Sequence, residues 1–447
     1  MPDQISIGLM GLGVVGVSVA NAIDAKAEVI KARVGCPVVV SRALVRDIGA
    51  VRSNLRNSVE LTTDPDIILN DPEIAIIVEL MGGEQPTLDY INQAISNGKH
   101  VVTANKEVLA KHGPELFKAA AEKGVMVRFE ASVGGGIPII GPLMNDLAAN
   151  DFTAVNAVIN GTTNYMLTRM ASDSNLDYQM VLKEARDRGY AEADPSADVD
   201  GIDAAFKLGI LASIAFHCTV RDTEVFREGI RRLSPADFAY ASELGYTIKL
   251  LATARRTHGR IQARVHPAFL PEDHPLAKVD GVYNAVELEG DLVDSAMFQG
   301  PGAGAEPTTS AVLADIMAEA HSIANGERLP VHMSDNNGLV VEPIDDLETK
   351  YYLRLRVYDR PGVLAQITTV FGDLEVSLAS FIQKEVGELG DVAEVVITTY
   401  VAKESAVQEA VRQLEALDSV SEVSNLVRIE EQSASLARGG QPKREGD

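Results

Sequence analysis

The stretch from Ala185 to Lys207 concentrates charged residues directly ahead of a strongly apolar segment. Between positions 192 and 203 its acidic side chains belong to Glu192, Asp194, Asp198, Asp200 and Asp203. Residues 200–216 have the pattern of a helix, which places Asp203 and Lys207, four residues apart, on one face. An ammonium group on a mostly buried helix needs a partner, so this pair favours an active site over the solvated face that an acidic run usually forms.

Two further segments carry residue types suited to chemistry. Lys106 follows a strand predicted at 100–104, and ligands of open α/β sheets bind at the carboxyl ends of the strands. The glycines at 134–136 permit backbone conformations closed to other residues. Such a turn can aim carbonyl oxygens at a hard cation, with Glu130 supplying charge. A tight turn that opens a helix at Pro138 explains the same spacing equally well.

The N-terminal segment ISIGLMGLGVVG has the pattern of a dinucleotide fingerprint between a strand and a helix. Gly11 allows the tight turn, Gly13 lets a pyrophosphate approach the backbone, and Gly16 lets the helix pack on the strand. The helix is expected to begin at Val14 and Val15, whose free N–H groups favour a phosphate. The segment therefore predicts a nucleotide cofactor.

The identity of that cofactor depends on the residues after the second strand. This strand ends ALVRD, so Arg46 and Asp47 occupy the region that contacts the ribose 2′-position. The arginine favours a 2′-phosphate and hence NADP(H), whereas the aspartate favours NAD(H). A surface Arg–Asp pair would account for both residues without any cofactor contact.

The pattern of strands and helices predicts three structural units. The N-terminal β-rich segments lie at 38–45, 74–80, 100–104 and 125–131, separated by helical segments, and indicate a Rossmann-type, doubly wound parallel sheet. The middle region has strands predicted at 152–160, 246–256, 261–270 and 281–291, which indicate an α+β substrate and oligomerisation domain. Thr162 or Thr163 is expected to cap a helix there. A long helix is expected to begin near Ser310 and to cross back to the nucleotide domain, which brings Gly302 and Gly304 near the cofactor.

The C-terminal region has the order βαββαβ, which is typical of a ferredoxin-like unit. The turn DRPG at 359–362 feeds its first helix and offers free N–H groups to a small carboxylate. The predicted boundaries are 1–150 for the nucleotide domain, completed by part of 300–330, then 151–325 for the substrate domain, 326–349 for a linker, 350–430 for the ferredoxin-like domain and 431–447 for a disordered tail.

Composition excludes several classes of function. A net charge of −24 over 447 residues argues against nucleic acid or an anionic membrane as the main partner. No apolar run is long enough to span a bilayer, and no signal peptide is recognised, so a cytoplasmic protein is expected. The two cysteines make no disulfide framework, and the histidines show no metal-ligand spacing.

Taken together, these motifs resemble the homoserine dehydrogenase family with a C-terminal ACT domain. The matching segments, in the family's order, are GLGVVG at 11–16, TANK at 103–106, EASVGGGIP at 130–138, the stretch from Ala185 to Lys207, and the DRPG and FGD…VSLASFIQ segments of the C-terminal region. The resemblance implies NAD(P)-dependent interconversion of L-aspartate 4-semialdehyde and L-homoserine, in threonine and methionine biosynthesis.

The resemblance also implies residue roles. It makes Lys207 the proton donor, with Asp203 and Glu192 at substrate-contacting positions. Of the remaining carboxylates of the acidic stretch, Asp198 is expected from its place in the sequence to reach the site. Lys106 is implied to contact cofactor and substrate, and Gly189 and Gly304 to lie near the cofactor. The implied sodium ligands are Glu130, Val133, Gly135 and Ile137.

Regulation and assembly are implied in the same way. The ACT domain implies control by an amino acid, most plausibly threonine, and the family implies a homodimer or homotetramer. Two alternatives stay open at this point: a non-catalytic sensor of amino acids or NADP(H), and a related Rossmann reductase of another small oxo acid. The two lysines and the acidic stretch argue against the sensor, because nucleotide binding alone needs neither.

Overall fold

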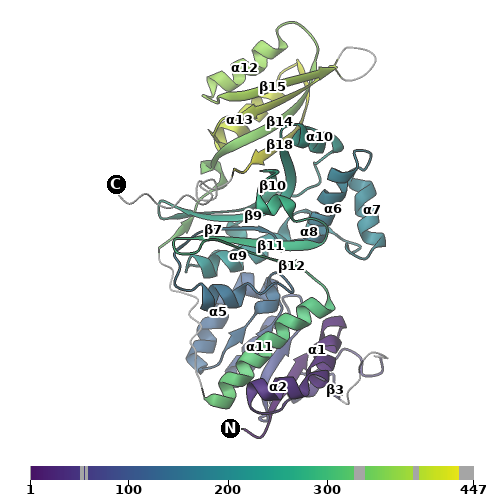
Figure 1. Ribbon diagram of the computed structural model, residues 1–447, viewed down its shortest axis with the longest axis vertical. Helices are drawn as coiled ribbons and strands as arrows, with labels where there is room; N and C mark the ends of the chain where they lie inside the picture. Colours follow the sequence, from purple (N-terminus) through teal and green to yellow (C-terminus); the bar gives the residue numbers. More distant parts are fainter. Residues whose placement is uncertain (1, 51–54, 56–58, 327–337, 386–391, 432–447) are drawn as a thin grey trace.

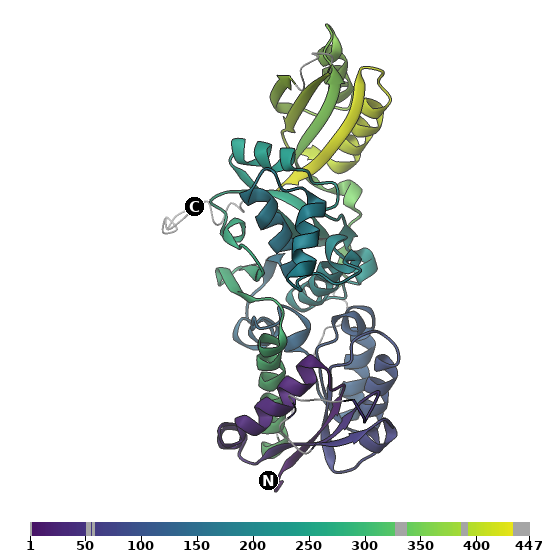
Figure 2. The same cartoon turned by 90° about the vertical axis from the view of Figure 1, so that its right-hand side faces the viewer.

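The computed structural model describes residues 2–50, 55, 59–326, 338–385 and 392–431. The molecule is elongated, and its three parts follow one another along the long axis (Figures 1 and 2). The nucleotide-binding part lies at one end, the strand-rich middle part at the centre, and the ferredoxin-like part at the other end. No helix of the described residues is long and apolar enough to cross a membrane.

The N-terminal part is built on a six-stranded parallel sheet. Its strands are β1 (Ile5–Met10), β2 (Val38–Leu44), β3 (Glu60–Thr62), β4 (Ile74–Glu79), β5 (His100–Thr103) and β6 (Val127–Arg128), in the order β3-β2-β1-β4-β5-β6. All six residues of β1 are buried, as expected for a strand covered on both faces. The direction of the strand order reverses beside β1, and in folds of this kind dinucleotides bind at the point of reversal. The predicted Rossmann-type fold is therefore confirmed.

Helices cover both faces of this sheet. They are α1 (Val14–Ala25), α2 (Ala27–Val34), α3 (Asp66–Leu69), α4 (Thr87–Ser96), α5 (Lys106–Lys123) and, from much later in the chain, α11 (Ala305–Asn325). The last of these packs against α1 and α2, as Figure 1 shows. It begins at Ala305, so the start expected near Ser310 was wrong. Pro307 falls in its first turn, where a missing N–H costs no helical hydrogen bond.

The middle part is an antiparallel sheet with helices on one face. Its main strands are β7 (Phe152–Val158), β9 (Tyr246–Thr257), β10 (Arg260–Pro271), β11 (Tyr283–Gly290) and β12 (Asp294–Pro301), in the order β12-β11-β7-β9-β10. Its helices are α6 (Gly161–Ser172), α7 (Tyr178–Asp187), α8 (Ser196–Val199), α9 (Ile202–Ala215) and α10 (Pro235–Glu243). Because α9 packs on β7, β9 and β10, it is buried along most of its length.

The C-terminal part has the predicted βαββαβ order. It comprises β14 (Glu348–Tyr358), α12 (Val363–Asp373), β15 (Leu378–Glu385), β16 (Val392–Thr399), α13 (Glu404–Glu415) and β18 (Val420–Ile429), with the short strand β17 (Ala402–Lys403) at its edge. The sheet order is β18-β14-β16-β15. The part expected to be a linker contains the strand β13 (Val340–Val341) in its described residues, and the expected tail lies outside the described residues from 432 on.

The middle and C-terminal sheets are continuous, which the sequence did not predict. Three segments share one edge of β10, each in parallel: β13, β8 (Phe226–Arg227) and β18. Backbone N–H groups of Glu342, Glu228 and Glu430 donate to the carbonyls of Ile261, Val265 and Phe269, at 2.7, 2.8 and 3.0 Å. The C-terminal unit is therefore attached through a β-ladder rather than by a linker alone.

Candidate active site

Asp203 lies between two lysines that come from different parts of the fold. It sits in the first turn of α9, and its Oδ2 accepts a hydrogen bond from Lys207 Nζ at 2.7 Å. Its Oδ1 forms an ion pair with Lys106 Nζ, at the first residue of α5. Lys207 also donates to the carbonyl of Ile159 at 2.8 Å. The structure thus brings together the three residues that the sequence predicted to be catalytic.

Local capping places the outer lysine. Asn105 precedes α5, and its Oδ1 accepts from the N–H of Val108 at 3.1 Å, while its Nδ2 donates to the carbonyl of Gly83 at 2.7 Å. A capped helix beginning directly after β5 fixes where Lys106 starts, at the carboxyl edge of the sheet. The side chain of Lys106 is 41% exposed, against 10% for Lys207, so the two ammonium groups occupy different environments.

Asn160 is the residue that sequence reasoning missed. Its Nδ2 donates to Asp198 Oδ1 at 2.7 Å and to Asp203 Oδ2 at 2.9 Å. Its Oδ1 accepts from the N–H and the hydroxyl of Thr163, both at 2.9 Å, so Asn160 caps α6 and the expected capping by Thr162 or Thr163 was wrong. An asparagine three residues before a helical N–H is a recognisable N-cap signal.

The charged groups of this cluster shift one another's pKa values. Burial lowers the pKa of Lys207 below its ordinary value, although Asp203 partly opposes that shift. Burial alone would raise the pKa of Asp203, but the charges of Lys207 and Lys106 hold it well below its usual range. For Lys106 the attraction of Asp203, Asp198 and Glu192 outweighs burial and raises the pKa. The cluster therefore holds a carboxylate charged between two cations, one of which gives up its proton more readily than an ordinary lysine.

The cluster opens into a cavity of about 490 Å³ between the nucleotide and middle parts. Among the predicted residues, its lining contains Lys106, Gly135, Gly189, Asp198, Asp203, Lys207 and Gly304. Glycine is required at position 304, where φ is +123°, and at 189, where φ is +75°. Glu192 is exposed and does not line the cavity, although its charge acts on Lys106. Backbone from three separated loops therefore meets the two lysines around one cavity.

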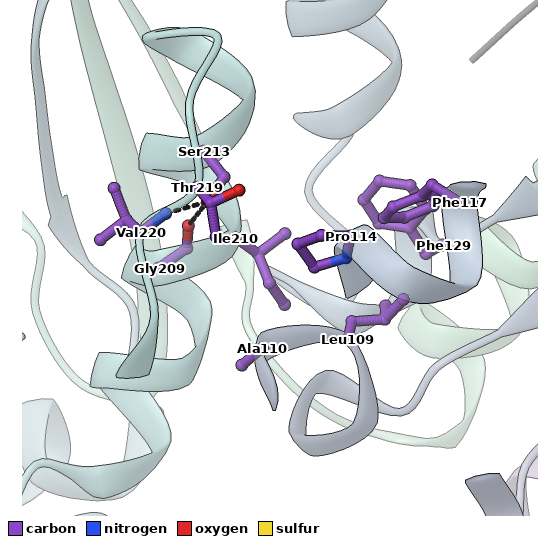
Figure 3. Close-up of a pocket in the computed structure, with 10 residues that line it drawn as sticks. All are labelled: Leu109, Ala110, Pro114, Phe117, Phe129, Gly209, Ile210, Ser213, Thr219 and Val220. Atoms are coloured by element: carbon purple, nitrogen blue, oxygen red, sulfur yellow. Dashed lines mark hydrogen bonds between the residues drawn. The ribbon is translucent and has the colours of Figure 1, made fainter. Parts of the chain in front are cut away.

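An apolar contact between α5 and α9 fixes the positions of the two lysines relative to each other. Figure 3 shows Pro114 of α5 facing Ile210 of α9, and Phe117 of α5 farther along against Phe129. Together with Leu109 these side chains surround a residual space of only about 10 Å³. In α9, Ser213 Oγ donates to the carbonyl of Gly209 at 2.7 Å and accepts from Val220 N–H at 3.0 Å (Figure 3). Because this contact is close-packed, the start of α5 and the start of α9 are fixed relative to each other.

A second cleft, of about 710 Å³, follows the carboxyl ends of β1, β2 and β4. Gly11, Gly13, Arg46 and Asp47 line it. A Cβ on Gly16 would lie 2.3 Å from the carbonyl oxygen of Gly11, so glycine is needed there for close packing, whereas the space above Gly13 is open. Val14, whose side chain is 79% exposed, and Val15 open α1, but their side chains do not line the cleft; what they offer are backbone N–H groups. This cradle fits a pyrophosphate.

Arg46 and Asp47 differ in how they are engaged. The carboxylate of Asp47 accepts a hydrogen bond from Gly49 N–H at 2.8 Å, which folds the local turn. Arg46 is exposed at the cleft and makes no ion pair within the described part of the chain. The expected surface pair between these two side chains is therefore absent from the described residues.

The glycine turn after β6 contains the predicted sodium ligands. The carboxylate of Glu130 accepts hydrogen bonds from the N–H groups of Ile139, Ile140 and Gly141, at 2.6, 2.9 and 2.6 Å, so it caps the helical turn that follows Pro138. Among the described residues, the carbonyls of Val133, Gly135 and Ile137 accept no hydrogen bond, and no side-chain cluster of three His, Cys, Asp or Glu suits a metal. What this turn offers a cation is main-chain oxygen.

Fold and site together define a nicotinamide-dependent oxidoreductase with an amino-acid-binding regulatory unit. The family models that match are homoserine dehydrogenase, NAD binding domain, at 11–130, homoserine dehydrogenase at 138–317, and the ACT domain at 351–419. The chain belongs to the homoserine dehydrogenase family. Its reaction is therefore the NAD(P)-dependent interconversion of L-aspartate 4-semialdehyde and L-homoserine, as predicted.

Similar proteins cover nearly the whole chain. The homoserine dehydrogenase of Synechocystis is 43% identical over 95% of this chain and 99% of its own, and that of Pseudomonas aeruginosa is 40% identical over 96% and 99%. A crystal structure of a homoserine dehydrogenase from Thiobacillus denitrificans superposes with a TM-score of 0.91 at 43% identity, covering 96% of this chain and 98% of that one. A sensor, or a reductase of another oxo acid, has no support in these comparisons.

Proposed function

We propose that Lys207 is the proton donor to the carbonyl oxygen of the aldehyde. The observation that carries this proposal is its position: a buried ammonium held by Asp203 and the carbonyl of Ile159, at the wall of the cavity. The nicotinamide cofactor supplies the hydride. As the carbonyl oxygen gains negative charge, Lys207 stabilises it and transfers a proton, which a lysine of lowered pKa does more readily.

Asp203, Lys106 and Asn160 support this step in different ways. Asp203 orients Lys207 and keeps it charged, while Lys106 extends the positive region toward the cofactor side of the cavity. Asp198 and Glu192 are proposed to bind the α-ammonium of the substrate, Asp198 from the cavity lining and Glu192 from the entrance. Gly189 and Gly304 are proposed to let the backbone approach the cofactor closely.

The test is substitution of Lys207 by methionine, which keeps the length of the side chain and removes its charge. Oxidation of homoserine, followed by absorbance at 340 nm, should lose about 10²–10⁴-fold in kcat with little change in the KM for the cofactor. Lys183→Met, at an exposed lysine of α7, is the matched control. Activity of Lys207→Met equal to that of the control would remove Lys207 from the mechanism.

We infer that NADP(H) is preferred over NAD(H). The exposed guanidinium of Arg46 at the cleft is suited to a 2′-phosphate, whereas the Asp47 carboxylate already accepts a backbone hydrogen bond. A hyperthermophilic archaeal homoserine dehydrogenase, 27% identical and covering 71% of this chain, has been solved in complex with NADPH. NAD(H) is proposed to serve as the poorer cofactor.

We also propose that a sodium ion binds at the glycine turn. The carbonyl oxygens of Glu130, Val133, Gly135 and Ile137 are suited to a hard monovalent cation, with Glu130 contributing its main chain because its carboxylate is engaged. The role is structural, since the ion would brace the loop that lines the cavity at Gly135.

The remaining proposals concern regulation, assembly and location. L-threonine is proposed as the effector of the ACT domain. A homodimer or homotetramer is proposed, supported by β12 and β15, which end the long sheet as edge strands. Light scattering coupled to gel filtration tests the assembly. A cytoplasmic location is proposed because both cysteines are free and buried, as in proteins of reducing compartments.

A further inference from the structure

A cavity of about 450 Å³ lies where the ACT domain meets the middle part of the chain. On one side is the segment that begins α10, with Arg232 and Ser234, and on the other are β14, β16 and β18. Leu353, Leu355 and Val357 face the helices of the ACT domain, so the alternating residues of β14 face away from them, toward this cavity. The volume falls within the range of small-molecule sites, about 300–1,000 Å³.

The cavity holds two arginines that lack carboxylate partners. Arg232 and Arg356 line it from opposite sides and form no ion pair with any described residue. The neighbouring Arg354 is different, since it is bound by Asp237 at 2.9 Å and by Glu394 at 3.0 Å. Two unpaired guanidinium groups facing one space are suited to a carboxylate, which they can bind with charge-assisted hydrogen bonds.

Acidic and hydroxyl groups line the same space. Glu394 and Glu422 lie on the strands beside Arg356 and are its register partners, and both line the cavity. The hydroxyl oxygen of Ser424 is buried and has no hydrogen-bond partner among the described residues, although a buried hydroxyl ordinarily finds one. The lining therefore offers a site for a negative group, a site for a positive group and an unsatisfied hydroxyl.

We propose that this junction cavity binds a free amino acid. Arg232 and Arg356 take its carboxylate, Glu422 and Glu394 take its ammonium group, and Ser424 contacts a polar side chain such as a hydroxyl. The proposal rests on the proposed regulation by an amino acid and gives that regulation a location. The ligand would touch both the segment leading into α10 and the ACT sheet, so its binding depends on how these two parts are oriented.

That orientation is set by a network directly beside the cavity. Asp237 of α10 is fully buried and accepts hydrogen bonds from Tyr352 OH at 3.1 Å, Arg354 Nε at 2.9 Å and Asn425 Nδ2 at 3.1 Å, all from the ACT sheet. Tyr240 of the same helix donates to Glu394 at 2.9 Å. A ligand that binds Glu394 competes with Arg354 and Tyr240 for this carboxylate and so acts on the network, which gives it different affinities for two arrangements of the domains.

The experiment is calorimetric titration of the full-length protein with L-threonine, and with L-isoleucine and L-methionine as further probes. Arg356→Gln and Arg232→Gln should each weaken binding at least about tenfold, the size expected for a lost charge-assisted contact, and the double variant should abolish it. Arg412→Gln is the matched control, because this exposed arginine of α13 lies away from the cavity. Arg360→Gln, in the DRPG turn, tests whether binding occurs there instead.

Each outcome is informative about one of the two proposals. Weakening by the cavity variants with unchanged binding by Arg412→Gln and Arg360→Gln supports the site. If the wild-type protein binds an amino acid and the double variant binds it equally well, the site is overturned while amino-acid regulation stands. If the wild-type protein binds none of the probes, the proposed effector is overturned and this site with it.

Discussion

One side-chain nitrogen of Asn160 donates to Asp203, at 2.9 Å, and to a second carboxylate, that of Asp198, at 2.7 Å. This asparagine links the residue that holds both lysines to Asp198 of α8, which lines the cavity. It also begins α6 and directly follows Ile159, whose carbonyl accepts from Lys207. Two adjacent residues thus position the proposed proton donor and its carboxylate partner.

Asn160→Asp should lower kcat by about tenfold to a hundredfold, because the change replaces a shared donor with a third carboxylate beside two others. The KM for the cofactor should change little, since Asn160 lies away from the glycine cleft. Steady-state kinetics with saturating cofactor measures this, and Asn175→Asp, at an exposed position, is the control. Unchanged kcat would show that Asn160 only caps its helix.

The pH dependence of activity should move in opposite directions in two variants. With Lys207 as the proposed proton donor, reduction of the aldehyde requires this lysine protonated, and the rate should fall as pH rises through the pKa of Lys207. Burial has the largest effect on that pKa and lowers it, the charge of Asp203 raises it, and the charge of Lys106 lowers it further. Asp203→Asn should therefore shift the fall in kcat to lower pH, and Lys106→Met should shift it to higher pH. Shifts in the same direction would contradict the proposed charge cluster.

Arg46→Ala should reduce kcat/KM with NADPH by about tenfold or more, because it removes the proposed partner of the 2′-phosphate, and should leave kcat/KM with NADH nearly unchanged. Parallel assays with the two cofactors give the ratio directly. Arg33→Ala, at an exposed residue of α2, serves as the control. Equal losses with both cofactors would assign Arg46 a role unrelated to the phosphate.

Sodium chloride should raise the melting temperature by about 2–4 °C over choline chloride at equal ionic strength, because an ion that binds only the folded state stabilises it. Differential scanning fluorimetry is sufficient for the measurement, and activity is not needed. Identical melting temperatures in the two salts would leave the glycine turn without a cation.

The ion pair between Arg428 and Glu404 should be important for stability. Their side chains are 1% and 2% exposed, and Arg428 Nε donates to Glu404 Oε2 at 2.9 Å. Arg428→Met leaves a buried carboxylate uncompensated, which costs about 3–5 kcal/mol. Chemical denaturation compares it with Arg412→Met, whose arginine is 65% exposed. A loss no larger than that of the control would mean that water reaches Glu404.

The sequence predicted the elements because they depend on local pattern, whereas most of the candidate site residues came from the resemblance to a family. The glycine fingerprint fixes a turn between β1 and α1, and the spacing of Asp203 and Lys207 follows from one helical turn. The ion pair of Lys106 with Asp203 joins residues far apart in the chain, and the resemblance to a family, not the spacing, associated them.

Contacts made by tertiary packing were not predictable in this way. The hydrogen bonds from Asn160 to two carboxylates depend on where α8 and α9 lie relative to β7, which no local pattern encodes. The Glu130 carboxylate accepts hydrogen bonds from three backbone N–H groups because the turn after it brings residues 139–141 close to its side chain. β18 belongs to the C-terminal unit and β10 to the middle unit, and the two strands pair with each other. The sequence pattern of each unit predicts a sheet without the other unit, so this pairing could not be predicted.

The shared edge of β10 has a practical consequence for making a deregulated enzyme. Deleting the chain from β14 onward would strip β18 from Ala268 and Phe269 and leave their backbone groups exposed on an open strand. Such an edge recruits other chains, so a shortened enzyme would be expected to precipitate or to associate wrongly before its kinetics could be measured. The proposed regulation is therefore better removed by point substitution at the domain junction than by shortening the gene.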